Sequence, residues 1–571
     1  MPTKKQARDM ASSRYSWHRK ASKPVSFWMF TLFLVLMAHR WIPESLWLMV
    51  HIITLGLITN SILIWSQHFT EALLKNRLPD RARPLQLARI YSLNASILLL
   101  MAGILLPLYP LTILGSAGVG VAVSWHGLAL LRQLRSALPS RFGLTVRYYI
   151  AAAWLLPLGA TFGALLAYDG LSASWQGRLI LAHEVTNLLG FVGITLVGTL
   201  LTLWPTMLRT VMLPDALSRS KQALTGLAAG LILALSGALT GLNWLAASGL
   251  LLYAAALSLV GALMIRTSAS KKPQDYATFS VAAGISWLLI GLIISAYLVA
   301  SSPFDSLSLR PVTPIFAVGF LAQTLLGAMS YLLPARMGGG PSAVRAANLE
   351  FNRFAAGRLS MINLSLLVFI LPVSFTGSLI RTGAALLGAF TLFAFIPLML
   401  RGVKASVRAR QAMIQARAQG QVPSPQAQAL TEQSVPHQRN ALIGSLVLLL
   451  VISLGLALDP AARARLFSPT PSSSTSSSQV MTVTVEATSD MRFNPSQIEV
   501  PAGTHLLVEV KNSDAKNAHD LTFSNGASTG RINPGSSKTL DLGVIDGDLE
   551  GWCSVLGHQA MGMTFTLKTS S

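Results

Sequence analysis

Residues 553–563 read Cys-Ser-Val-Leu-Gly-His-Gln-Ala-Met-Gly-Met, and another histidine, His519, precedes them. Together these residues supply one thiolate, two imidazoles and a thioether. A soft thiolate stabilises Cu(I), imidazoles suit both oxidation states, and a distant thioether leaves a trigonal geometry that changes little when one electron arrives. The pattern predicts a type 1 copper site with four metal ligands: His519, Cys553, His558 and Met563.

The sequence around these ligands predicts β-structure. From Val480 onward, short segments of alternating apolar and polar residues are separated by Asn, Asp, Gly and Pro. The spacing of Cys553, His558 and Met563 fits a loop between two strands, and His519 would come from a neighbouring strand. We therefore expect an all-β Greek-key sandwich over residues 480–571, with the metal site at one pole.

Several segments of this region resemble the plastocyanin/azurin-like cupredoxins. They are Met491-Arg-Phe-Asn-Pro, Ile498-Glu-Val-Pro-Ala-Gly, Asn517-Ala-His519-Asp and the Cys-His-Met loop, and the resemblance covers residues 480–571. It implies three equatorial ligands, His519, Cys553 and His558, with Met563 as the axial one. Met561 is the alternative axial ligand, but it lies three residues past His558, and the spacing of the family favours Met563.

Two further observations bear on this copper site. Asp520 follows the first histidine where plastocyanins usually carry Asn, so the hydrogen bonding around the thiolate should differ from theirs. Cys553 is the only cysteine in the chain, so it has no partner for an internal disulfide, and coordination explains its presence. The alternative is a sandwich without metal that serves as a binding module, but all four ligands are present.

The rest of the chain predicts an integral membrane protein. Hydrophobic residues make up 52% and charged residues 12%, and many apolar stretches are long enough to cross a bilayer. The fold class we expect is a polytopic α-helical membrane bundle of about 13 spans followed by the sandwich. The predicted spans are 25–41, 46–66, 88–108, 111–131, 147–168, 178–204, 222–241, 243–265, 279–300, 312–334, 358–375, 380–400 and 440–458.

Basic residues set the predicted orientation. With the N-terminus in the cytoplasm, nearly all Lys and Arg of the connecting loops fall on the cytoplasmic side, as the positive-inside rule requires. An odd number of spans then sends the C-terminal sandwich to the extracytoplasmic face. We expect a multi-pass protein of the cell (inner) membrane, with the lipid bilayer as one of its partners.

These patterns divide the chain into six predicted parts. They are a basic cytoplasmic tail (1–24), a bundle of about 12 helices (25–401), a basic cytoplasmic loop (402–439), a last transmembrane helix (440–458), a Ser/Pro-rich linker (459–479) and the cupredoxin domain (480–571). The formal net charge of the chain is +22. Residues 480–571 carry six basic and ten acidic residues, so the positive charge belongs to the membrane part. It therefore indicates topology and no nucleic-acid partner.

Two histidines in the predicted bundle are candidate cofactor ligands. His51 and His183 each lie about five residues inside the outer end of a span, roughly 8 Å below the surface. Polar groups within hydrocarbon are candidates for functional sites. Two imidazoles at one depth on different helices predict a haem or metal site facing the sandwich. The alternative is that lipid headgroups, water or carbonyl groups satisfy both histidines.

Segments around these histidines resemble a twelve-helix module that some bacteria fuse to cupredoxins, including copper nitrite reductases. The module is distantly similar to the haem-copper oxidase and nitric-oxide-response membrane families. The segments begin at His51, Ala182 and Phe320, and the resemblance covers residues 25–400. It implies that His51 and His183 are haem or copper ligands. No histidine occurs between His183 and His437, so the ligands that oxidases draw from later helices are missing, and no complete catalytic site is visible.

The function expected from the sequence is single-electron transfer. A type 1 copper on the extracytoplasmic face would exchange electrons with a redox partner protein or membrane electron carrier. The bundle would be the anchor and a haem- or metal-binding partner, and the chain would be an oxidoreductase only in this electron-transfer sense. The alternative function is copper capture, transport or sensing. The predicted spans lack the paired Cys or Met-rich arrays that a copper path would use.

Overall fold

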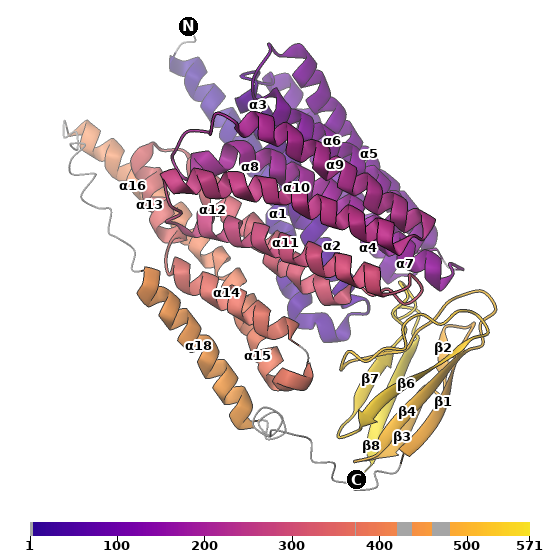
Figure 1. Cartoon of the computed structure of the whole chain (residues 1–571). Helices are drawn as coiled ribbons and strands as arrows, with labels where there is room; N and C mark the ends of the chain where they lie inside the picture. The colour runs from indigo at the N-terminus through magenta and orange to yellow at the C-terminus, as the bar shows by residue number, and fades with distance from the viewer. Residues whose placement is uncertain (1–3, 169, 372, 420–436, 459–479, 571) are drawn as a thin grey trace.

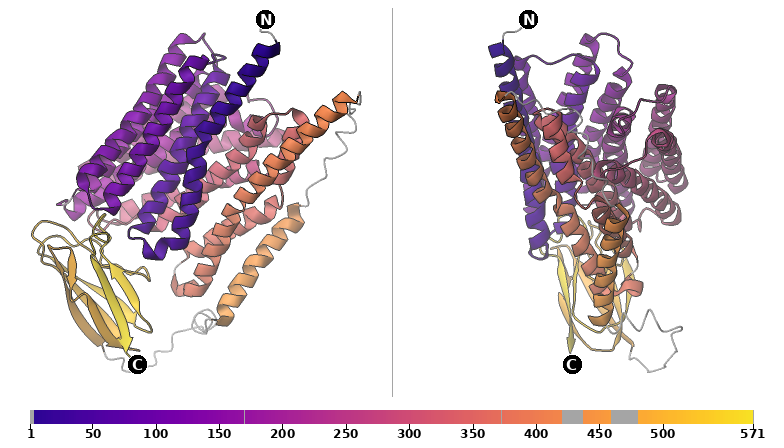
Figure 2. Two further views of the ribbon diagram at one scale, coloured as in Figure 1. Left: turned by 180° about the vertical axis from the view of Figure 1, so that it is seen from behind. Right: turned by 90° about the vertical axis from the view of Figure 1, so that its left-hand side faces the viewer.

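The computed structural model describes residues 4–168, 170–371, 373–419, 437–458 and 480–570. A helical bundle is followed by a β-sandwich, and the sandwich packs against one end of the bundle (Figure 1). The first helix begins at the opposite end of the bundle from the sandwich, as the views in Figure 2 also show. The predicted linker at 459–479 lies outside the described residues.

Most of the bundle consists of long helices. The helical elements are α1 (Lys4–Ala38), η1 (His39–Trp41), α2 (Ser45–His51), η2 (Ile52–Thr59), α3 (Asn60–Leu73), η3 (Asp80–Ala82), α4 (Arg83–Leu105), α5 (Tyr109–Ser136), α6 (Gly143–Leu166), α7 (Ala173–Glu184), η4 (Val185–Gly193), α8 (Ile194–Met207), α9 (Ala216–Thr240), α10 (Asn243–Ser270), α11 (Tyr276–Ser301), η5 (Arg310–Val312), η6 (Ile315–Ala322), α12 (Gln323–Met337), α13 (Pro341–Phe351), α14 (Ala355–Ile370), α15 (Val373–Phe393), α16 (Phe395–Ala418) and α18 (His437–Leu458).

In the described part of the chain, 12 helices are long and apolar enough to cross a membrane. A further pair, α13 and α14, passes the same test together although the two helices are bent by 42°. The twelve helices and the bent pair coincide with the thirteen predicted spans. The predicted fold class, a polytopic helical bundle followed by a sandwich, is confirmed, and the chain is a multi-pass membrane protein.

Three predicted boundaries differ from the structure. Helix α1 begins at Lys4, so the basic tail continues the first span as helix. Helix α16 runs to Ala418, so the first half of the predicted loop at 402–439 is helical. The eleventh span is predicted to end at residue 375, but helix α14 ends at Ile370 and a separate helix, α15, begins at Val373.

Local sequence explains where individual helices begin and end. Asp275 caps α11: its carboxylate accepts the backbone N–H of Thr278 at 2.8 Å, and the Thr278 hydroxyl receives the Asp275 N–H in return. This reciprocal pair satisfies two helix donors that would otherwise lack partners. Gly241 ends α9 with a φ of 78°, a conformation that glycine adopts without a steric penalty. The chain therefore reverses within two residues and begins α10 at Asn243.

Three spans contain a π-helical segment at similar places, namely η2, η4 and η6. His51 directly precedes η2, and His183 lies one residue before the end of the helix that leads into η4. Single π-helical turns inside α-helices occur frequently at functional sites. The widened turns therefore mark the same region of the bundle as the two candidate histidines.

The first and third of these spans pack in the same way. A Cβ atom at Gly56 would lie 2.7 Å from Cγ of Trp28, and one at Gly319 would lie 2.7 Å from Cγ of Trp287. Each tryptophan ring N–H donates to an asparagine side chain at 2.6 Å, in Asn94 and Asn363 respectively. The bundle thus contains an internal repeat in which glycine lets an indole approach the π-helical segment closely.

The sandwich is built from two four-stranded sheets. The strands are β1 (Val480–Thr488), β2 (Arg492–Asn494), β3 (Gln497–Pro501), β4 (His505–Asn512), β5 (Thr522–Phe523), β6 (Ser537–Val544), β7 (Leu549–Trp552) and β8 (Thr564–Ser570). One sheet has the order β2-β1-β4-β6 and the other β3-β8-β7-β5. Two pairs, β1/β2 and β7/β8, join strands that are neighbours in the chain, whereas the parallel pairs β1/β4 and β3/β8 join strands that are separated in the chain.

Alternation along the strands creates the core of the sandwich. In β4, Leu506, Val508 and Val510 are buried between the sheets, whereas the residues between them are half-buried. The core also contains two residues of the predicted metal site, Cys553 and Met563. The site is therefore continuous with the hydrophobic core and shares its rigidity.

Candidate metal centre

Three of the predicted ligands converge at the pole of the sandwich that faces the bundle. Cys553 directly follows β7, Met563 directly precedes β8, and His558 lies in the loop between them. His519 joins them from the segment between β4 and β5, which a pair of backbone hydrogen bonds with Ile532 holds in place. Two sheet strands thus fix both ends of the ligand loop, as the sequence spacing predicts.

The ligand atoms have the separations expected around one metal ion. Sγ of Cys553 lies 3.5 Å from Nδ1 of His558 and 3.9 Å from Nδ1 of His519, and the two Nδ1 atoms are 3.2 Å apart. Atoms about 2.0 to 2.3 Å from a shared metal in a trigonal array would lie about 3.5 Å apart. The side chains of all three residues are buried, at most 1% exposed. The geometry therefore fits a three-coordinate N,N,S metal site shielded from water.

The structure favours Met563 over Met561 as the axial ligand. Met563 is buried in the core, its backbone N–H donates to the carbonyl of His558, and its own carbonyl accepts the N–H of Cys553. Met561 is half-buried, and its carbonyl accepts a hydrogen bond from Arg492 on the surface. The four predicted residues form a His-Cys-His-Met cluster, with Met563 fixed to both ends of the ligand loop.

Asp514 orients the first histidine. Its Oδ2 lies 3.1 Å from Nε2 of His519, so the imidazole turns Nδ1 toward the other ligands. Burial alone would raise the pKa of the Asp514 carboxyl. Hydrogen bonds from the Lys516 N–H, from Asn517 and from His519 outweigh this effect and lower the pKa to about 2. The carboxylate therefore stays ionised and fixes the ring in the orientation that metal binding needs.

The surroundings of the Cys553 thiol suit the binding of a cation at the sulfur. Burial raises the pKa of the Cys553 thiol, and the nearby Asp520 carboxylate raises it further. The backbone N–H of Asp520 points at the sulfur with an N–S distance of 3.5 Å, which suits a thiolate acceptor. A coordinated metal ion deprotonates a thiol outright. The donor set and its hydrogen bonds thus fit a bound cation.

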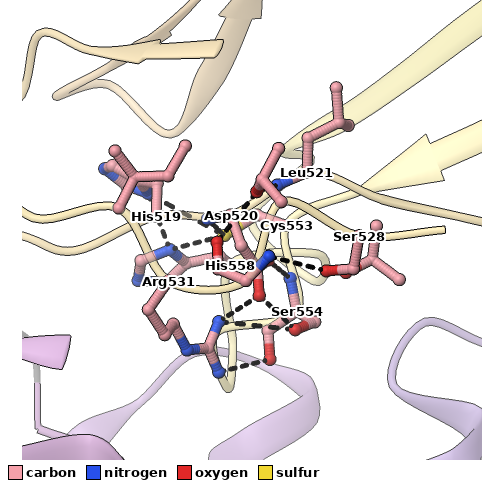
Figure 3. A network of polar contacts seen from close by, with 12 residues as sticks. His519, Asp520, Leu521, Ser528, Arg531, Cys553, Ser554 and His558 are labelled. Atoms are coloured by element: carbon pink, nitrogen blue, oxygen red, sulfur yellow. Dashed lines mark hydrogen bonds and ion pairs between the residues drawn. The ribbon is translucent and has the colours of Figure 1, made fainter. Parts of the chain in front are cut away.

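Asp520, the residue that departs from the plastocyanin pattern, anchors the ligand loop (Figure 3). Its carboxylate accepts both the backbone N–H and the hydroxyl of Ser554, the residue after the cysteine, and pairs with Arg531 at 2.7 Å. Arg531 also donates to the carbonyl of Ser554 at 3.1 Å. Burial would raise the pKa of Asp520, but Arg531 and the Ser554 hydrogen bonds hold it below its usual range.

We expect the substitution Asp520→Asn to raise the reduction potential of the copper site. It removes a buried negative charge beside the thiolate and leaves the positive charge of Arg531, which together favour Cu(I) over Cu(II). The expected change is on the order of 60 mV, which corresponds to a tenfold change in the Cu(I)/Cu(II) ratio. Redox titration of the blue absorption measures it, with Asp541→Asn at the far side of the sandwich as the control. A lower or unchanged potential would contradict this account of Asp520.

The ligand loop contacts the membrane bundle through Glu44. This residue lies between η1 and α2 with a φ of 54°, a left-handed conformation that is uncommon for a residue other than glycine. Its Oε1 accepts the backbone N–H of Gly557 at 3.2 Å, and its own N–H donates to Oε1 of Gln559, also at 3.2 Å. These two loop residues flank the ligand His558. The bundle therefore contacts the metal site at the edge where one imidazole lies.

Other charges and contacts support the same interface. The backbone N–H of Ala173, at the start of α7, donates to Oδ1 of Asn533 in the sandwich at 3.1 Å. Arg310 and Arg531 approach Glu44 closely enough to act on its charge. Burial raises the pKa of the Glu44 carboxyl to about 7, although the Gly557 hydrogen bond and the two arginines lower it. Glu44 is thus a half-buried acid at the junction of the two parts.

The structure brings the two membrane histidines together. The rings of His51 and His183 have centroids 6.2 Å apart and an interplanar angle of 33°. Nδ1 of His51 lies 2.8 Å from the carbonyl of Trp47, and Nδ1 of His183 lies 2.8 Å from the carbonyl of Gly159. In both rings a proton on Nδ1 leaves Nε2 as the nitrogen that can bind a metal.

Sequence reasoning found the ligands but missed the residues that support them. Asp514 could have been noticed as a carboxylate five residues before His519. Glu44 is an acidic residue in a connection between two apolar spans, where acids are few. Arg531 carries no local signal, since its partners Asp520 and Ser554 come from other segments of the fold.

Comparisons with known proteins concern the C-terminal part. The family model described as "Cupredoxin-like domain" matches residues 459–548, a range that ends before Cys553. The chain resembles the dithionite-reduced auracyanin of the photosynthetic bacterium Roseiflexus castenholzii, with 17% identity over 16% of this chain and 97% of that one and a TM-score of 0.15. It also resembles auracyanin A, a "blue" copper protein of Chloroflexus aurantiacus, with 14% identity over 16% of this chain and 99% of that one and a TM-score of 0.15.

A multi-copper oxidase from Pediococcus acidilactici also matches, with 13% identity over 19% of this chain and 29% of that one and a TM-score of 0.15. No curated protein matches the chain. The ligand loop lies beyond the range of the family match, so the assignment of the metal site depends on its geometry. The family match and the two-sheet fold agree that the C-terminal part of this membrane protein is a cupredoxin-like domain carrying a His-Cys-His-Met cluster.

Proposed function

We propose that the chain is a membrane-anchored electron-transfer protein whose cupredoxin domain holds one type 1 copper. The observation that carries this proposal is the cluster of His519, Cys553 and His558, whose ligand atoms all lie within 4.8 Å of one another and are buried. Met563 completes the set from the same loop. A copper bound there would supply a Cu(II)/Cu(I) couple.

The residues of the sandwich favour fast electron exchange by limiting movement. Asp514 fixes one imidazole, Asp520 and Arg531 fix the segment after the cysteine, and two sheet strands hold the ends of the loop. Ligands that cannot shift need little reorganisation when one electron arrives. Burial excludes water, which prevents the thiolate from reacting with oxidants in solution.

The first test is spectroscopic and uses the full-length protein purified in detergent. We expect one copper per cupredoxin domain, an intense thiolate-to-copper absorption in the visible red, and a copper resonance with narrow hyperfine splitting. The oxidised colour should disappear on addition of one electron per copper. A protein that binds copper without this absorption would have a different metal site, and the electron-transfer proposal would fail.

We also propose that the bundle is the redox partner of this copper. His51 and His183 would hold a second metal, as haem iron or as a bare copper ion, and this metal would exchange electrons with the copper of the sandwich. Three observations support this: the separation of the two rings, the matching Nδ1 hydrogen bonds, and the adjacent π-helical segments. The contact of Glu44 with the ligand loop also connects the two proposed metal sites, because Glu44 immediately precedes helix α2, which ends at His51.

Substituting either membrane histidine should remove this second metal. We expect His51→Ala and His183→Ala to reduce metal beyond the cupredoxin copper from about one equivalent to background, while the blue absorption stays intact. Metal analysis combined with a pyridine haemochrome spectrum separates a bare ion from haem. His39→Ala is the control, since His39 lies in an exposed part of the same end of the bundle. Equal metal content in all variants would refute the second centre.

For the orientation, we propose that the sandwich is extracytoplasmic and the N-terminus cytoplasmic in the inner membrane. The support is the accumulation of Lys and Arg in the loops at the end of the bundle away from the sandwich. Reporter fusions to the C-terminus test it: alkaline phosphatase should be active and green fluorescent protein dark. The opposite result would place the copper site in the cytoplasm.

A further inference from the structure

A polar cavity lies at the end of the bundle opposite the sandwich. Its volume is about 150 Å³. Helices α1, α3 and α12 and the connection between α3 and α4 enclose it, and these elements meet near the N-terminal end of the chain in Figure 1. The residues that line it are Trp17, Gln67, His68, Glu71, Ala72, Arg77, Leu78, Asp80, Arg83 and Arg336.

The charges around this cavity do not cancel. Glu71 and Arg83 neutralise each other through two parallel hydrogen bonds of 2.7 and 2.8 Å. Arg77 and Arg336 also line the cavity, and Asp80 is the other carboxylate of the lining. Within the described residues, no carboxylate forms an ion pair with Arg77. The lining therefore carries an excess of positive charge.

A second, smaller space continues the cavity into the bundle. It shares Trp17 and Gln67 with the first and is also lined by Gln86, Arg89 and His126. Arg89 is 4% exposed, and in the described part of the chain no carboxylate pairs with it. The positive charge inside the cavity thus reaches the interior of the membrane part, where an uncompensated charge is costly.

Polar atoms around the smaller space lack partners. Nε of Arg89 and Nε2 of Gln86 are buried donors without an acceptor, and Oε1 of Gln67 is a buried acceptor without a donor. Native proteins satisfy nearly all such atoms with protein, water or ligand groups. The two orphan donors and the excess of arginine point to the same missing partner, an oxygen atom that carries negative charge.

We propose that this cavity binds an oxyanion of the phosphate class. The planar guanidinium group matches the geometry of phosphate oxygens and binds them through paired hydrogen bonds. Arg77 and Arg336 would hold the anion at the opening, and Arg89 with Gln86 would receive an oxygen or an anion-bound water further inside. The Glu71–Arg83 pair forms one wall, and Cζ of Arg83 lies 5.1 Å from the centroid of the Trp17 ring.

Two sources can supply this chemistry. The cavity is lined by residues of the predicted membrane helices and of the basic connection at residues 74–83. Basic pockets between membrane helices bind the headgroups of anionic phospholipids. Soluble phosphate or a phosphorylated metabolite offers the same oxygens without the acyl chains. The experiment therefore includes one probe of each kind.

The test uses the full-length protein in detergent with two probes. One is phosphatidylglycerol in mixed micelles, compared with phosphatidylcholine and read out by native mass spectrometry. The other is inorganic phosphate, compared with chloride at equal ionic strength and read out by equilibrium dialysis. We expect saturable binding of at least one probe with a stoichiometry of one. Arg77→Ala should weaken it about fivefold, because one arginine near an anionic group is lost.

Matched variants distinguish this site from general basic charge. Arg81→Ala is the control, since Arg81 is exposed on the same connection but does not line the cavity. Arg89→Gln removes the inner charge and should weaken binding at least as much as Arg77→Ala, while the blue absorption of the copper site stays unchanged. If only phosphatidylglycerol binds, the natural ligand of the cavity is a lipid headgroup. If both probes bind, the ligand is a soluble oxyanion. Binding of neither, or equal loss in Arg77→Ala and Arg81→Ala, overturns the proposal.

Discussion

Replacing Cys553 by Ser should abolish the blue absorption completely and weaken copper binding by at least about 100-fold. Loss of a hydrogen-bonding neighbour of a metal ligand already costs 10- to 100-fold in affinity, and here a ligand itself is lost. A hydroxyl does not ionise near neutral pH and gives no thiolate-to-copper transition. Copper content after dialysis against a chelator, together with the visible spectrum, measures both effects.

The fold should survive this substitution, because serine is nearly the same size as the fully buried Cys553. Circular dichroism of the purified variant checks this point. Met561→Leu is the matched control, since the structure places Met563 and not Met561 in the core beside the cysteine. If Met561→Leu shifted the reduction potential and Met563→Leu did not, the axial assignment would be wrong although the copper site would stand.

Replacing Glu44 by Ala should release the ligand loop from the bundle. The Glu44 side chain accepts the Gly557 N–H, and a hydrogen bond between neutral groups contributes about 0.5 to 1.5 kcal/mol. We expect amide hydrogen exchange of the segment around Gly557 to accelerate by about 2- to 10-fold below pH 4.5, with no change in the sheet strands. If the bundle is the redox partner proposed above, electron exchange between the sandwich and the bundle should slow as well, because the undocked copper site lies farther from its partner.

Glu44→Gln is the informative companion variant. An amide oxygen can still accept the Gly557 N–H, so we expect the loop to stay protected. If Glu44→Ala and Glu44→Gln accelerate exchange equally, the charge and not the hydrogen bond holds the loop. If neither variant changes exchange, Glu44 does not hold the sandwich against the bundle.

The pH dependence of this contact follows from the raised pKa of Glu44. The carboxyl has a pKa of about 7 when docked, against the ordinary value of 4.5 when exposed. Its contribution to docking is therefore complete below pH 4.5 and is lost as the pH rises through 7. Protection of the loop, corrected for intrinsic exchange, should fall over this window in the native protein and stay level in Glu44→Gln.

Local patterns in the sequence were sufficient for much of this structure. Apolar segments of sufficient length predict membrane spans, because a segment within hydrocarbon must form all of its backbone hydrogen bonds internally, as a helix does. The Cys-His-Met spacing predicts one loop because both ends are fixed by strands. These predictions depend on residues close together in the chain.

The parts that sequence reasoning missed depend on contacts between distant residues. Glu44 and Gly557 are separated by 513 positions, and nothing near either residue indicates the other. The turn between α13 and α14 contains Asn352, whose side chain accepts a hydrogen bond from the backbone of a different helix. The internal repeat is carried by Gly56 and Gly319 with their tryptophans, and single glycines are too common in apolar spans to reveal it.

Helix α2 has a mechanical consequence for the two proposed redox centres. It is seven residues long, with Glu44 immediately before it and His51 as its last residue, and it continues without a break into η2 and α3. The two residues are therefore about 10 Å apart along one continuous helix. A tilt of this helix at its Glu44 end would also displace the imidazole of His51, so that undocking of the sandwich would affect both proposed redox centres together.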